Sequence, residues 1–580
     1  MRINCHAHVF NAKSVFNKYT VEILINRINE VDLPDILKNI ITKQLKKVIL
    51  DVGDYIDEKS FYEQIIKQIA ETEEYKRLLN YVKPSLKAEL QIIGSGKIEK
   101  ASAEVLAKLI SKIYNAFDSS DDDIRKQNII DILDFLRIIL QPSVRNITDI
   151  LINQLPMKTD AIVALTMDIT EDGIENRQFE QQIKETSGMV LAYPGRIFPF
   201  VAVNPNRSDY FQIMERALNG MGYVGVKLYP SLGYDINSIA MKKVYSYCNE
   251  REIPILMHCS KGGFKHSDAY KNNSSPSHWG EILREHNNLK ICFGHFGGDE
   301  YHAGLPEIDD TPPWAPDILD LMSYYPNVYT DISYHTAPMD GGDVESRYFN
   351  TVKNYLNDPT FKKRILWGSD FFLVRMRLKE KNHWNYVKKM LGDDYFNQMS
   401  ISNAMDYLGF KDDKMSWALK NYIRFIGMNA HQVETKPPTW IEKSVKKDFG
   451  NSVVFNATLL GPAWTINNKA HLILYNDFNE WEFLKKTPFD ESGILKLSAM
   501  IYWRDMKSSS SQIAAIELRK RAVKIIKKFK QNNAVPALRN GRRLKQDQII
   551  KILMPVLKDG SKTLAELGAI CDSLFDFKIN

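Results

Sequence analysis

Two histidines near the start of the chain have a spacing that suits a metal site. His6 and His8 stand in the segment Ile3-Asn-Cys-His-Ala-His-Val-Phe10. Side chains alternate across a strand, so Asn4 and both imidazoles share one face. Strands buried in a parallel sheet are normally apolar on both faces, so these polar groups need a compensating partner. A divalent cation would be such a partner, whereas two surface histidines near a terminus would need none.

Four later segments carry polar residues that suit the same chemistry. They are Ile255-Leu-Met-His258, Cys292-Phe-Gly-His295, Trp367-Gly-Ser-Asp370 and Gly225-Val-Lys227. Each of these residues alone is as compatible with a buried core position or a loop cap as with a ligand. In a closed barrel, however, polar residues at the carboxyl ends of different strands converge on one cavity. The order of the whole set along the chain therefore predicts a shared site.

The spacing of the β-rich segments predicts an α/β fold, the (β/α)8 TIM barrel. After the first strand, seven apolar runs follow at 160–170, 197–204, 224–230, 253–258, 289–295, 327–331 and 364–370. From the third strand on they recur roughly every 25 to 40 residues, the length of a βα unit, and eight units close a barrel. Helical patterns at 209–219, 239–251 and 278–285 lie between the runs. We expect the barrel to comprise residues 1–11 and 157–430.

A long insertion separates the first two predicted strands. Residues 12–156 stand where one helix would suffice, and their amphipathic stretches at 21–27, 33–48, 59–69, 101–117 and 122–140 predict helices. Because the insertion leaves from the carboxyl end of a barrel strand, it must begin on the face where barrel active sites are built. We interpret it as a helical cap over the site. An oligomerisation module with no part in the site is the alternative.

Residues 440–580 predict a small α+β domain after a linker near 435–439. Residues 451–505 alternate as antiparallel strands do, and 512–530 and 547–557 show helical patterns. Between residues 515 and 551 stand twelve Lys or Arg residues and two acids, although the whole chain has a net charge of only +6. The basic character thus belongs to this segment. It could contact nucleic acid or an acidic protein, but a solvated helix face is the favoured interpretation.

Composition excludes several other classes of protein. The 580 residues contain no apolar run of the roughly 18 residues needed to cross a bilayer. Cleavage of a signal peptide would remove His6 and His8, so we expect a cytoplasmic protein. The five cysteines are odd in number, scattered and without CxxC spacing, which indicates reduced thiols and no disulfide framework. A homo-oligomer is compatible with this composition.

The ordered motifs resemble the amidohydrolase superfamily. The resemblance is closest to the amidohydrolase 2 branch, which is related to aminocarboxymuconate semialdehyde decarboxylase. The segments that carry it are His6-Ala-His8, Phe200-Val-Ala-Val-Asn-Pro205, Gly225-Val-Lys-Leu-Tyr-Pro230, His258, Gly294-His-Phe-Gly-Gly298 and Trp367-Gly-Ser-Asp370. The resemblance covers residues 1–11 and 157–410. It explains neither the helical insertion nor the segment after about residue 435.

The resemblance implies a metal-dependent hydrolase that acts on a small carboxylate-bearing molecule through metal-activated water. One divalent ion, for which we expect Zn²⁺, would be held by a set of four side chains: His6, His8, His258 and Asp370. His295 would stand beside the ion as general acid or base, and Asp370 would share the proton. A non-oxidative decarboxylase would use the same residues, and the sequence does not separate the two reactions.

Lys227 leaves the number of metal ions open. In binuclear members of the superfamily, a lysine at this strand end is carboxylated and bridges two ions. The surrounding segment resembles the mononuclear branch more, in which the ammonium group would bind a substrate carboxylate. A buried ion pair with Asp331 is a further alternative, and Asp331 itself suits a supporting or loop-capping role. Three other residues are candidates for substrate binding: Arg207, Tyr229 and Arg375.

Two rival functions involve the basic C-terminal segment. TatD-like nucleases also carry His-x-His on a barrel, so a phosphoesterase that acts on nucleic acid is an alternative. Those enzymes expect a bridging glutamate near the fourth strand, where Lys227 stands. The other rival is an assembly component that binds its partner through 515–551. Steeply salt-dependent binding to DNA or RNA, lost on deletion of residues 512–580, would favour the partner-binding interpretation.

Overall fold

The computed structural model describes most of the N-terminal three quarters of the chain. It covers residues 1–15, 58–72, 138–170 and 178–449, except 308, 310, 376 and 412–413, together with 463–466, 469–472 and short helical pieces between residues 21 and 135. Contacts divide the chain into two units. The first consists of residues 1–190 and 196–425, and the second of residues 191–195 and 426–580.

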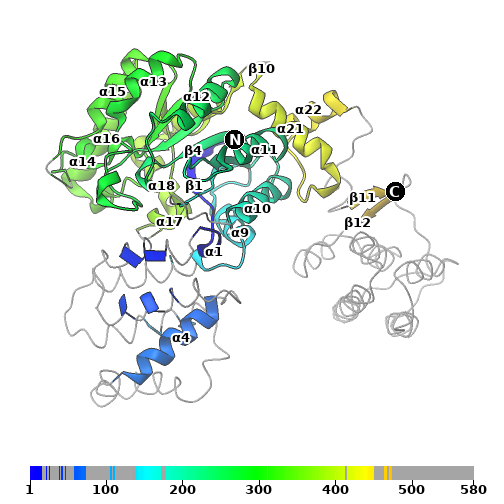
Figure 1. Cartoon of the computed structure of the whole chain (residues 1–580), viewed down its shortest axis with the longest axis horizontal. Coiled ribbons are helices and arrows are strands. Elements are labelled where there is room, and N and C mark those ends of the chain that lie inside the picture. Colours follow the sequence, from blue (N-terminus) through cyan, green and yellow to red (C-terminus); the bar gives the residue numbers. More distant parts are fainter. Residues whose placement is uncertain are drawn as a thin grey trace. The chain divides into compact units, whose positions relative to one another are not determined.

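Eight parallel strands form the centre of the first unit (Figure 1). They are β1 (Ile3–His8), β2 (Ala161–Leu165), β3 (Ile197–Ala202), β4 (Gly225–Leu228), β5 (Ile255–His258), β6 (Ile291–Gly294), β7 (Val328–Asp331) and β8 (Ile365–Leu366). Each strand pairs with the next one along the chain, from β1 to β8. Every residue in these strands is buried, because helices cover one face of the sheet and the barrel interior covers the other.

Backbone hydrogen bonds bring the last strand back to the first. Cys5 N donates to the carbonyl oxygen of Trp367 at 2.7 Å. The amides of Ser369 and Asp370, which follow β8, donate to the carbonyl oxygen of His6 at 3.3 and 2.8 Å. This closure confirms the predicted (β/α)8 TIM barrel, and it places the segment after β8 against the two N-terminal histidines.

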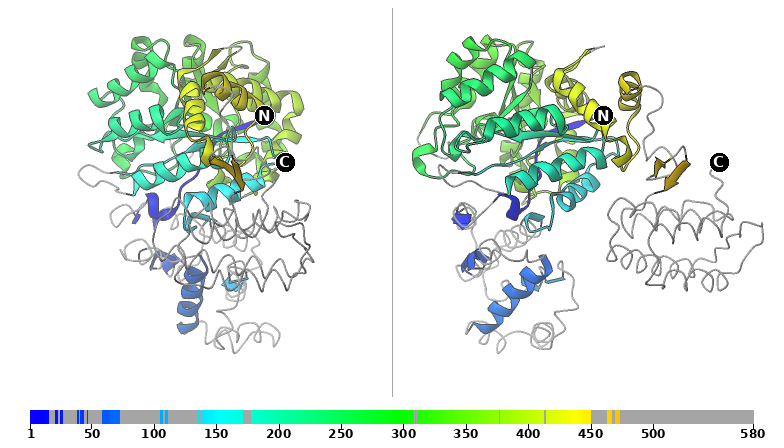
Figure 2. Two further views of the ribbon diagram at one scale, coloured as in Figure 1. Left: turned by 90° about the vertical axis from the view of Figure 1, so that its right-hand side faces the viewer. Right: turned by 45° about the vertical axis from the view of Figure 1, so that its right-hand side comes forward.

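Helices surround the strands, as both views of Figure 2 show. Those of the barrel are α10 (Phe179–Ala192), α11 (Tyr210–Gly220), α12 (Ile239–Arg251), α13 (Trp279–Glu285), α14 (Glu300–Ala303), α15 (Ala315–Tyr324), α16 (Gly342–Asn357), α17 (Phe371–Val374), α18 (Glu380–Leu391), α19 (Asp393–Asn397), α20 (Ala404–Leu408) and α21 (Trp417–Met428). Sequence periodicity correctly predicted α11, α12 and α13. The α12 helix begins where the Ser238 side chain accepts a hydrogen bond from Met241 N, as an N-cap residue does.

The predicted insertion leaves and returns beside β1. Its described elements include α1 (Ala12–Val15), α4 (Glu58–Glu71) and α9 (Val144–Gln154), and α4 matches a predicted helix. Asn11 Nδ2 donates to the carbonyl oxygen of Gln141 at 3.2 Å, although 130 positions separate the two residues. Gln182 of α10 donates to the carbonyl oxygen of Ser14 at 3.3 Å, which fixes α1 to the barrel. The cap role remains a prediction.

A row of aromatic rings connects the insertion with the barrel. The ring centroids of His8 and Phe10 are 5.6 Å apart, and those of Phe10 and Phe372 are 4.9 Å apart. Phe372 lies in α17, directly after the segment that closes the barrel, and its centroid is 6.4 Å from that of Phe135 in the insertion. The row therefore starts at one of the two N-terminal histidines and ends in the insertion.

The second unit contains α22 (Thr439–Phe449) and an antiparallel hairpin of β11 (Ala463–Ile466) and β12 (Lys469–Leu472). The hairpin falls within the region that alternates in the sequence. The predicted helices 512–530 and 547–557 and the basic segment 515–551 lie outside the described residues, so the C-terminal α+β domain remains a prediction. No helix in the described part of the chain is long and apolar enough to cross a membrane.

Candidate metal centre

His6, His8 and Asp370 form a buried group at the carboxyl end of the barrel. One possible ligand atom from each lies within 4.8 Å of the others. His6 Nε2 and His8 Nδ1 are buried and have no hydrogen-bond partner among the described residues. A buried polar atom without a partner costs about 1–3 kcal/mol, so two such nitrogens beside a carboxylate call for a ligand. Imidazole nitrogens and carboxylate oxygens are ligands for Zn²⁺, so this group fits a divalent cation.

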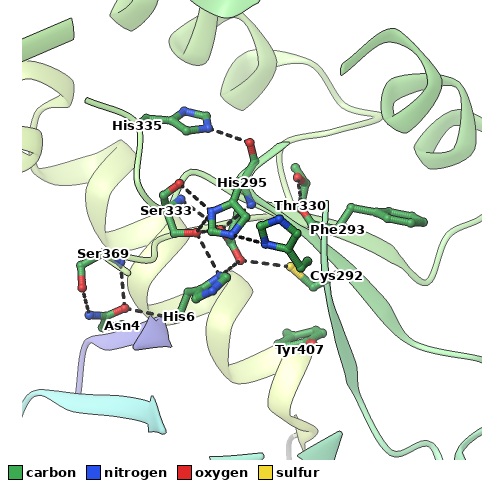
Figure 3. A network of polar contacts seen from close by, with 12 residues as sticks. Asn4, His6, Cys292, Phe293, His295, Thr330, Ser333, His335, Ser369 and Tyr407 are labelled. Atoms are coloured by element: carbon green, nitrogen blue, oxygen red, sulfur yellow. Dashed lines mark hydrogen bonds and ion pairs between the residues drawn. The ribbon is translucent and has the colours of Figure 1, made fainter. Parts of the chain in front are cut away.

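A second group with metal-ligand spacing shares His6 and adds His295 and Asp331. A serine side chain already occupies the space between these three residues (Figure 3). Ser333 Oγ lies 2.9 Å from His6 Nδ1 and 2.9 Å from His295 Nδ1, and it donates to Asp331 Oδ1. Because the hydroxyl satisfies these atoms, we interpret the second group as a hydrogen-bond network that orients the two histidines.

His258 belongs to neither group. Its Nδ1 lies 3.0 Å from His295 Nε2, and its Nε2 lies 3.0 Å from the carbonyl oxygen of Gly262. The Tyr229 ring stacks on the His258 ring at 4.1 Å between centroids, and the Tyr229 hydroxyl accepts a hydrogen bond from Phe264 N. To act as a fourth ligand, His258 would have to exchange one of its two contacts for the ion. Its role as a ligand remains a prediction.

Two glycines allow the chain to pack closely around His6. A Cβ atom at Gly368 would lie 2.6 Å from His6 Cβ, and one at Gly294 would lie 3.0 Å from His6 Cε1. Both glycines belong to motifs noted in the sequence, Trp367-Gly-Ser-Asp370 and Gly294-His-Phe-Gly-Gly298. The absence of a side chain at these positions allows the segments that carry Asp370 and His295 to approach His6 closely.

Four residues near the site have left-handed backbone conformations. The φ angles are 66° at His295, 45° at Phe296, 57° at Tyr334 and 54° at Asp370. Each follows the end of β6, β7 or β8. Left-handed backbone costs energy in residues other than glycine, and such residues cluster at functional sites. The surrounding hydrogen bonds hold these conformations; His335 Nε2, for example, lies 2.8 Å from the carbonyl oxygen of His295.

Burial favours neutral imidazoles at His8, His258 and His295. Burial lowers the pKa of His8 well below its ordinary value, and the charges of Lys227 and His6 lower it further. Burial also lowers the pKa of His258 and of His295. A neutral imidazole retains the lone pair that a metal ligand or a general base needs.

The two carboxylates of the site differ in environment. Burial raises the pKa of Asp370, while the charges of His6 and Lys227 act in the opposite direction. Burial also works to raise the pKa of Asp331, but the charge and hydrogen bond of His6 outweigh it, so this pKa falls below its ordinary value. Asp331 is thus a stable anion, whereas Asp370 gains from a cation beside it.

Lys227 has an unusual environment for an ammonium group. Its Nζ is buried and has no hydrogen-bond partner among the described residues, so the predicted pair with Asp331 is not formed as a hydrogen bond. Burial lowers the pKa of Lys227 to about 8, although the charges of Asp331 and Asp370 counteract this effect. The side chain is therefore available for an anion or for carboxylation, and both predicted roles remain open.

The two candidate arginines are engaged by other side chains. Arg207 Nε donates to Asp168 Oδ2 at 2.7 Å, and its Nη2 donates to Thr170 Oγ1 at 3.1 Å. Arg375 Nη1 donates to Gln154 Oε1 of α9 at 2.8 Å. Both arginines are buried, so substrate binding by either one would require these contacts to open.

Sequence reasoning missed several residues that hold the site together. Asn4 Oδ1 accepts hydrogen bonds from His6 N at 3.1 Å and Ser369 N at 3.0 Å. Its Nδ2 donates to Ser369 Oγ and to Glu380 Oε1, which links β1 with α18. Asn4 shares a strand face with His6 and His8, so the sequence pattern could have identified it as part of the site. Glu380 and Ser333 gave no comparable signal, because their contacts depend on how separate loops and helices pack.

A comparison with protein-family models finds a match within the barrel. Residues 160–410 match the protein-family model described as Amidohydrolase. The match includes β2 to β8 with Lys227 and His258, and it also includes His295 and Asp370, which follow β6 and β8. The barrel region of the chain is therefore similar to amidohydrolases, and its fold is a TIM barrel.

Several solved structures are similar to this chain. A TIM-barrel protein from Bordetella bronchiseptica is 15% identical, with a TM-score of 0.33 over 45% of this chain and 82% of that chain. The 2,6-dihydroxybenzoate decarboxylase from Rhizobium is 14% identical, with a TM-score of 0.30 over 45% and 86%. The 4-oxalomesaconate hydratase from Rhodopseudomonas palustris is 13% identical, with a TM-score of 0.35 over 74% and 99%. No curated protein matches the chain.

Proposed function

We propose that this chain is a metal-dependent hydrolase that acts on a small carboxylate-bearing molecule and holds one Zn²⁺ ion. His6, His8 and Asp370 would hold the ion, with His258 as a fourth ligand. The observation that carries the proposal is that a ligand atom from each of His6, His8 and Asp370 lies within 4.8 Å of the others. Both histidines also have a buried ring nitrogen without a hydrogen-bond partner among the described residues. A divalent ion there would supply positive charge and lower the pKa of an adjacent water molecule to about 7.

The residues around the ion supply proton transfer. His295 lies beside His6, with 4.6 Å between the ring centroids, and the pKa of His295 is lowered by burial. A neutral His295 can accept a proton from water at Nε2 and return it to the leaving group when Nε2 exchanges its contact with His258 for the water. Asp370, whose pKa burial raises, can share that proton. Ser333 and Asp331 hold His295 in place for this step.

Lys227 would bind the carboxylate of the substrate. Its ammonium group is buried, lacks a hydrogen-bond partner and points toward no protein acceptor within hydrogen-bond distance among the described residues. An anionic substrate would supply the missing acceptor, and charge-assisted hydrogen bonds of this kind are worth about 1.5–3 kcal/mol. Tyr229, next to His258, would border the same part of the site.

Metal analysis of purified protein tests the centre. We expect about one ion per wild-type chain, about one in Lys227→Ala, and loss of the ion on dialysis in Asp370→Asn. The result that would reject the single-ion site is about two ions in wild type that fall together in Lys227→Ala, because this would indicate a carboxylated bridging lysine. Wild type that binds no ion under any metallation condition would reject the metal-dependent function itself.

Product analysis distinguishes the two reactions. With a panel of small carboxylates, a hydrolase incorporates ¹⁸O from labelled water into the product and releases no CO₂. A decarboxylase, the alternative, releases CO₂ and incorporates one solvent deuterium at the carbon that carried the carboxylate. The Lys227→Met variant should show a higher KM with little change in kcat if the ammonium group binds the substrate in the ground state and the transition state alike.

A further inference from the structure

Asp331 is not among the proposed ligands of the ion, but its two carboxylate oxygens contact His6 and His295. Oδ2 lies 2.9 Å from His6 Nδ1. Oδ1 accepts hydrogen bonds from three donors: His295 N at 3.1 Å, Ser333 N at 3.0 Å and the Ser333 hydroxyl. Asp331 is fully buried, so no water competes for these contacts. One side chain at the end of β7 thus links the residues that follow β6 with His6 in β1.

The donors and acceptors around Asp331 determine which nitrogen of His6 carries hydrogen. An ionised carboxylate only accepts hydrogen bonds, so His6 Nδ1 must be the donor in its contact with Oδ2. In a neutral imidazole the other nitrogen then carries the lone pair. That nitrogen is Nε2, a buried atom without a hydrogen-bond partner among the described residues. His6 is also the residue that groups with His8 and Asp370 at metal-ligand spacing. The contact therefore presents the lone pair of His6 to the place proposed for the ion.

The same loop determines the tautomer of His295. Its Nδ1 lies 3.1 Å from the carbonyl oxygen of Ser333, which can only accept a hydrogen bond. His295 Nδ1 therefore carries hydrogen, and its Nε2 faces His258. Asp331 and Ser333, two positions apart, thus favour hydrogen on Nδ1 in both His6 and His295.

We propose that Asp331 is a positioning residue that holds His6 in the tautomer with hydrogen on Nδ1 and so enables His6 to bind the ion. This inference rests on the proposed function, because it takes His6 as a ligand. Carboxylates that accept from metal-binding histidines orient the ring and raise its basicity, and their loss typically costs 10- to 100-fold in metal affinity. A role limited to capping the turn after β7 would affect stability alone.

The variant Asp331→Asn tests the proposal with minimal change of shape. Three donors converge on the position of Oδ1, so the amide oxygen should occupy that position and the NH2 group should face His6 Nδ1. His6 would then accept at Nδ1 and carry its hydrogen on Nε2, the atom that faces the ion. We expect metal affinity, measured by competition with a chelator, to fall about 10- to 100-fold.

Nitrogen NMR of the metal-free protein separates the two roles, because loss of a turn cap alone would not change the tautomer of His6. The ¹⁵N shifts of the His6 ring, assigned by their loss in His6→Gln, should show hydrogen on Nδ1 in wild type and on Nε2 in Asp331→Asn. Two control variants keep Asp331. Ser333→Ala should retain the wild-type tautomer of His6, and Thr330→Val, which loses the bond to the Phe293 carbonyl oxygen, should lower stability without changing metal affinity.

The possible outcomes separate this inference from the proposed function. Wild type with hydrogen on His6 Nε2 would overturn the inference without the need for any variant. Asp331→Asn that is less stable but keeps both metal affinity and tautomer would also overturn it and leave Asp331 as a turn cap. Wild type that shows the expected tautomer but binds no ion would reject the proposed function instead.

Discussion

The two sides of the metal centre differ in how their polar atoms are satisfied. On the side of β1, β4 and β8, three buried nitrogens of the candidate site have no hydrogen-bond partner among the described residues: His6 Nε2, His8 Nδ1 and Lys227 Nζ. On the side of β5, β6 and β7, both ring nitrogens of His258, His295 and His335 have partners. Buried polar groups are normally paired, so the unpaired side marks where a ligand belongs. The hydrogen bonds of the paired side fix the positions of its three histidines.

This difference predicts opposite consequences for substitutions on the two sides. On the unpaired side, removal of a polar side chain should abolish ligand binding and should relieve, not create, unsatisfied groups in the metal-free protein. On the paired side, removal of a side chain should leave a partner without its hydrogen bond and should reduce stability first. Three measurements test this difference between the two sides.

The largest effect is expected for His8→Ala. Loss of a direct ligand should reduce metal affinity by more than the roughly 100-fold upper range for supporting residues. In wild type, an ion at 100 times its dissociation constant stabilises the fold by about 2.7 kcal/mol, so a chelator should lower the melting temperature. The melting temperature of His8→Ala should not respond to the chelator. His286→Ala, at the end of α13, is the control and should respond like wild type; a chelator response in His8→Ala would remove His8 from the ligands.

A somewhat smaller effect is expected for Lys227→Met in the metal-free protein. Burial lowers the pKa of Lys227 from 10.5 to about 8, so below pH 8 the folded state holds a buried charge that the unfolded state exposes to water. Between pH 8 and 10.5 the folded state loses the proton first. Wild-type stability should therefore rise across this window by about 3 kcal/mol relative to the variant.

Urea unfolding of both proteins at pH 7 and pH 10.5 measures this difference. At pH 7 the variant should be the more stable of the two, because methionine removes the buried charge at similar volume. Lys290→Met is a matched control, since Lys290 is also buried but donates to the carbonyl oxygen of Asp406 at 2.7 Å. That control should be less stable than wild type. Equal stability of wild type and Lys227→Met at both pH values would contradict the prediction.

The smallest effect is expected on the paired side, for His335→Phe. His335 contacts the carbonyl oxygen of His295 at 2.8 Å and the Tyr348 hydroxyl at 2.6 Å. Phenylalanine keeps the ring but leaves both groups without this partner, so the free energy of unfolding should fall by about 1–3 kcal/mol. Metal affinity should stay at the wild-type value. Weaker metal binding with unchanged stability would show that the two sides are not functionally distinct.

The sequence was sufficient to predict the barrel and to single out some residues of the candidate centre. Strands of a parallel sheet are apolar runs, so polar residues at their ends stand out, and His6, His8 and Asp370 were found in this way. The contacts of His258 with His295 and Gly262 could not be predicted, because they depend on side-chain orientation within loops. The left-handed backbone at His295 and Asp370 was also hidden, because neither residue type requires it. Asp331 was noticed at its strand end, but only the structure shows that both of its oxygens are engaged.

The hydrogen bond between Asn11 and Gln141 has a consequence for how the barrel forms. β1 pairs with β2 across about 150 intervening positions. The hydrogen bond between Asn11 and Gln141 closes most of this long loop. The entropic cost of such closure grows only slowly, by about 0.6 kcal/mol for each doubling of length, so the excursion costs little at equilibrium. Its cost is kinetic, because pairings distant in sequence slow folding. If the intervening helices assemble early, they bring Asn11 and Gln141 together and shorten the search by which the first strand finds its neighbour.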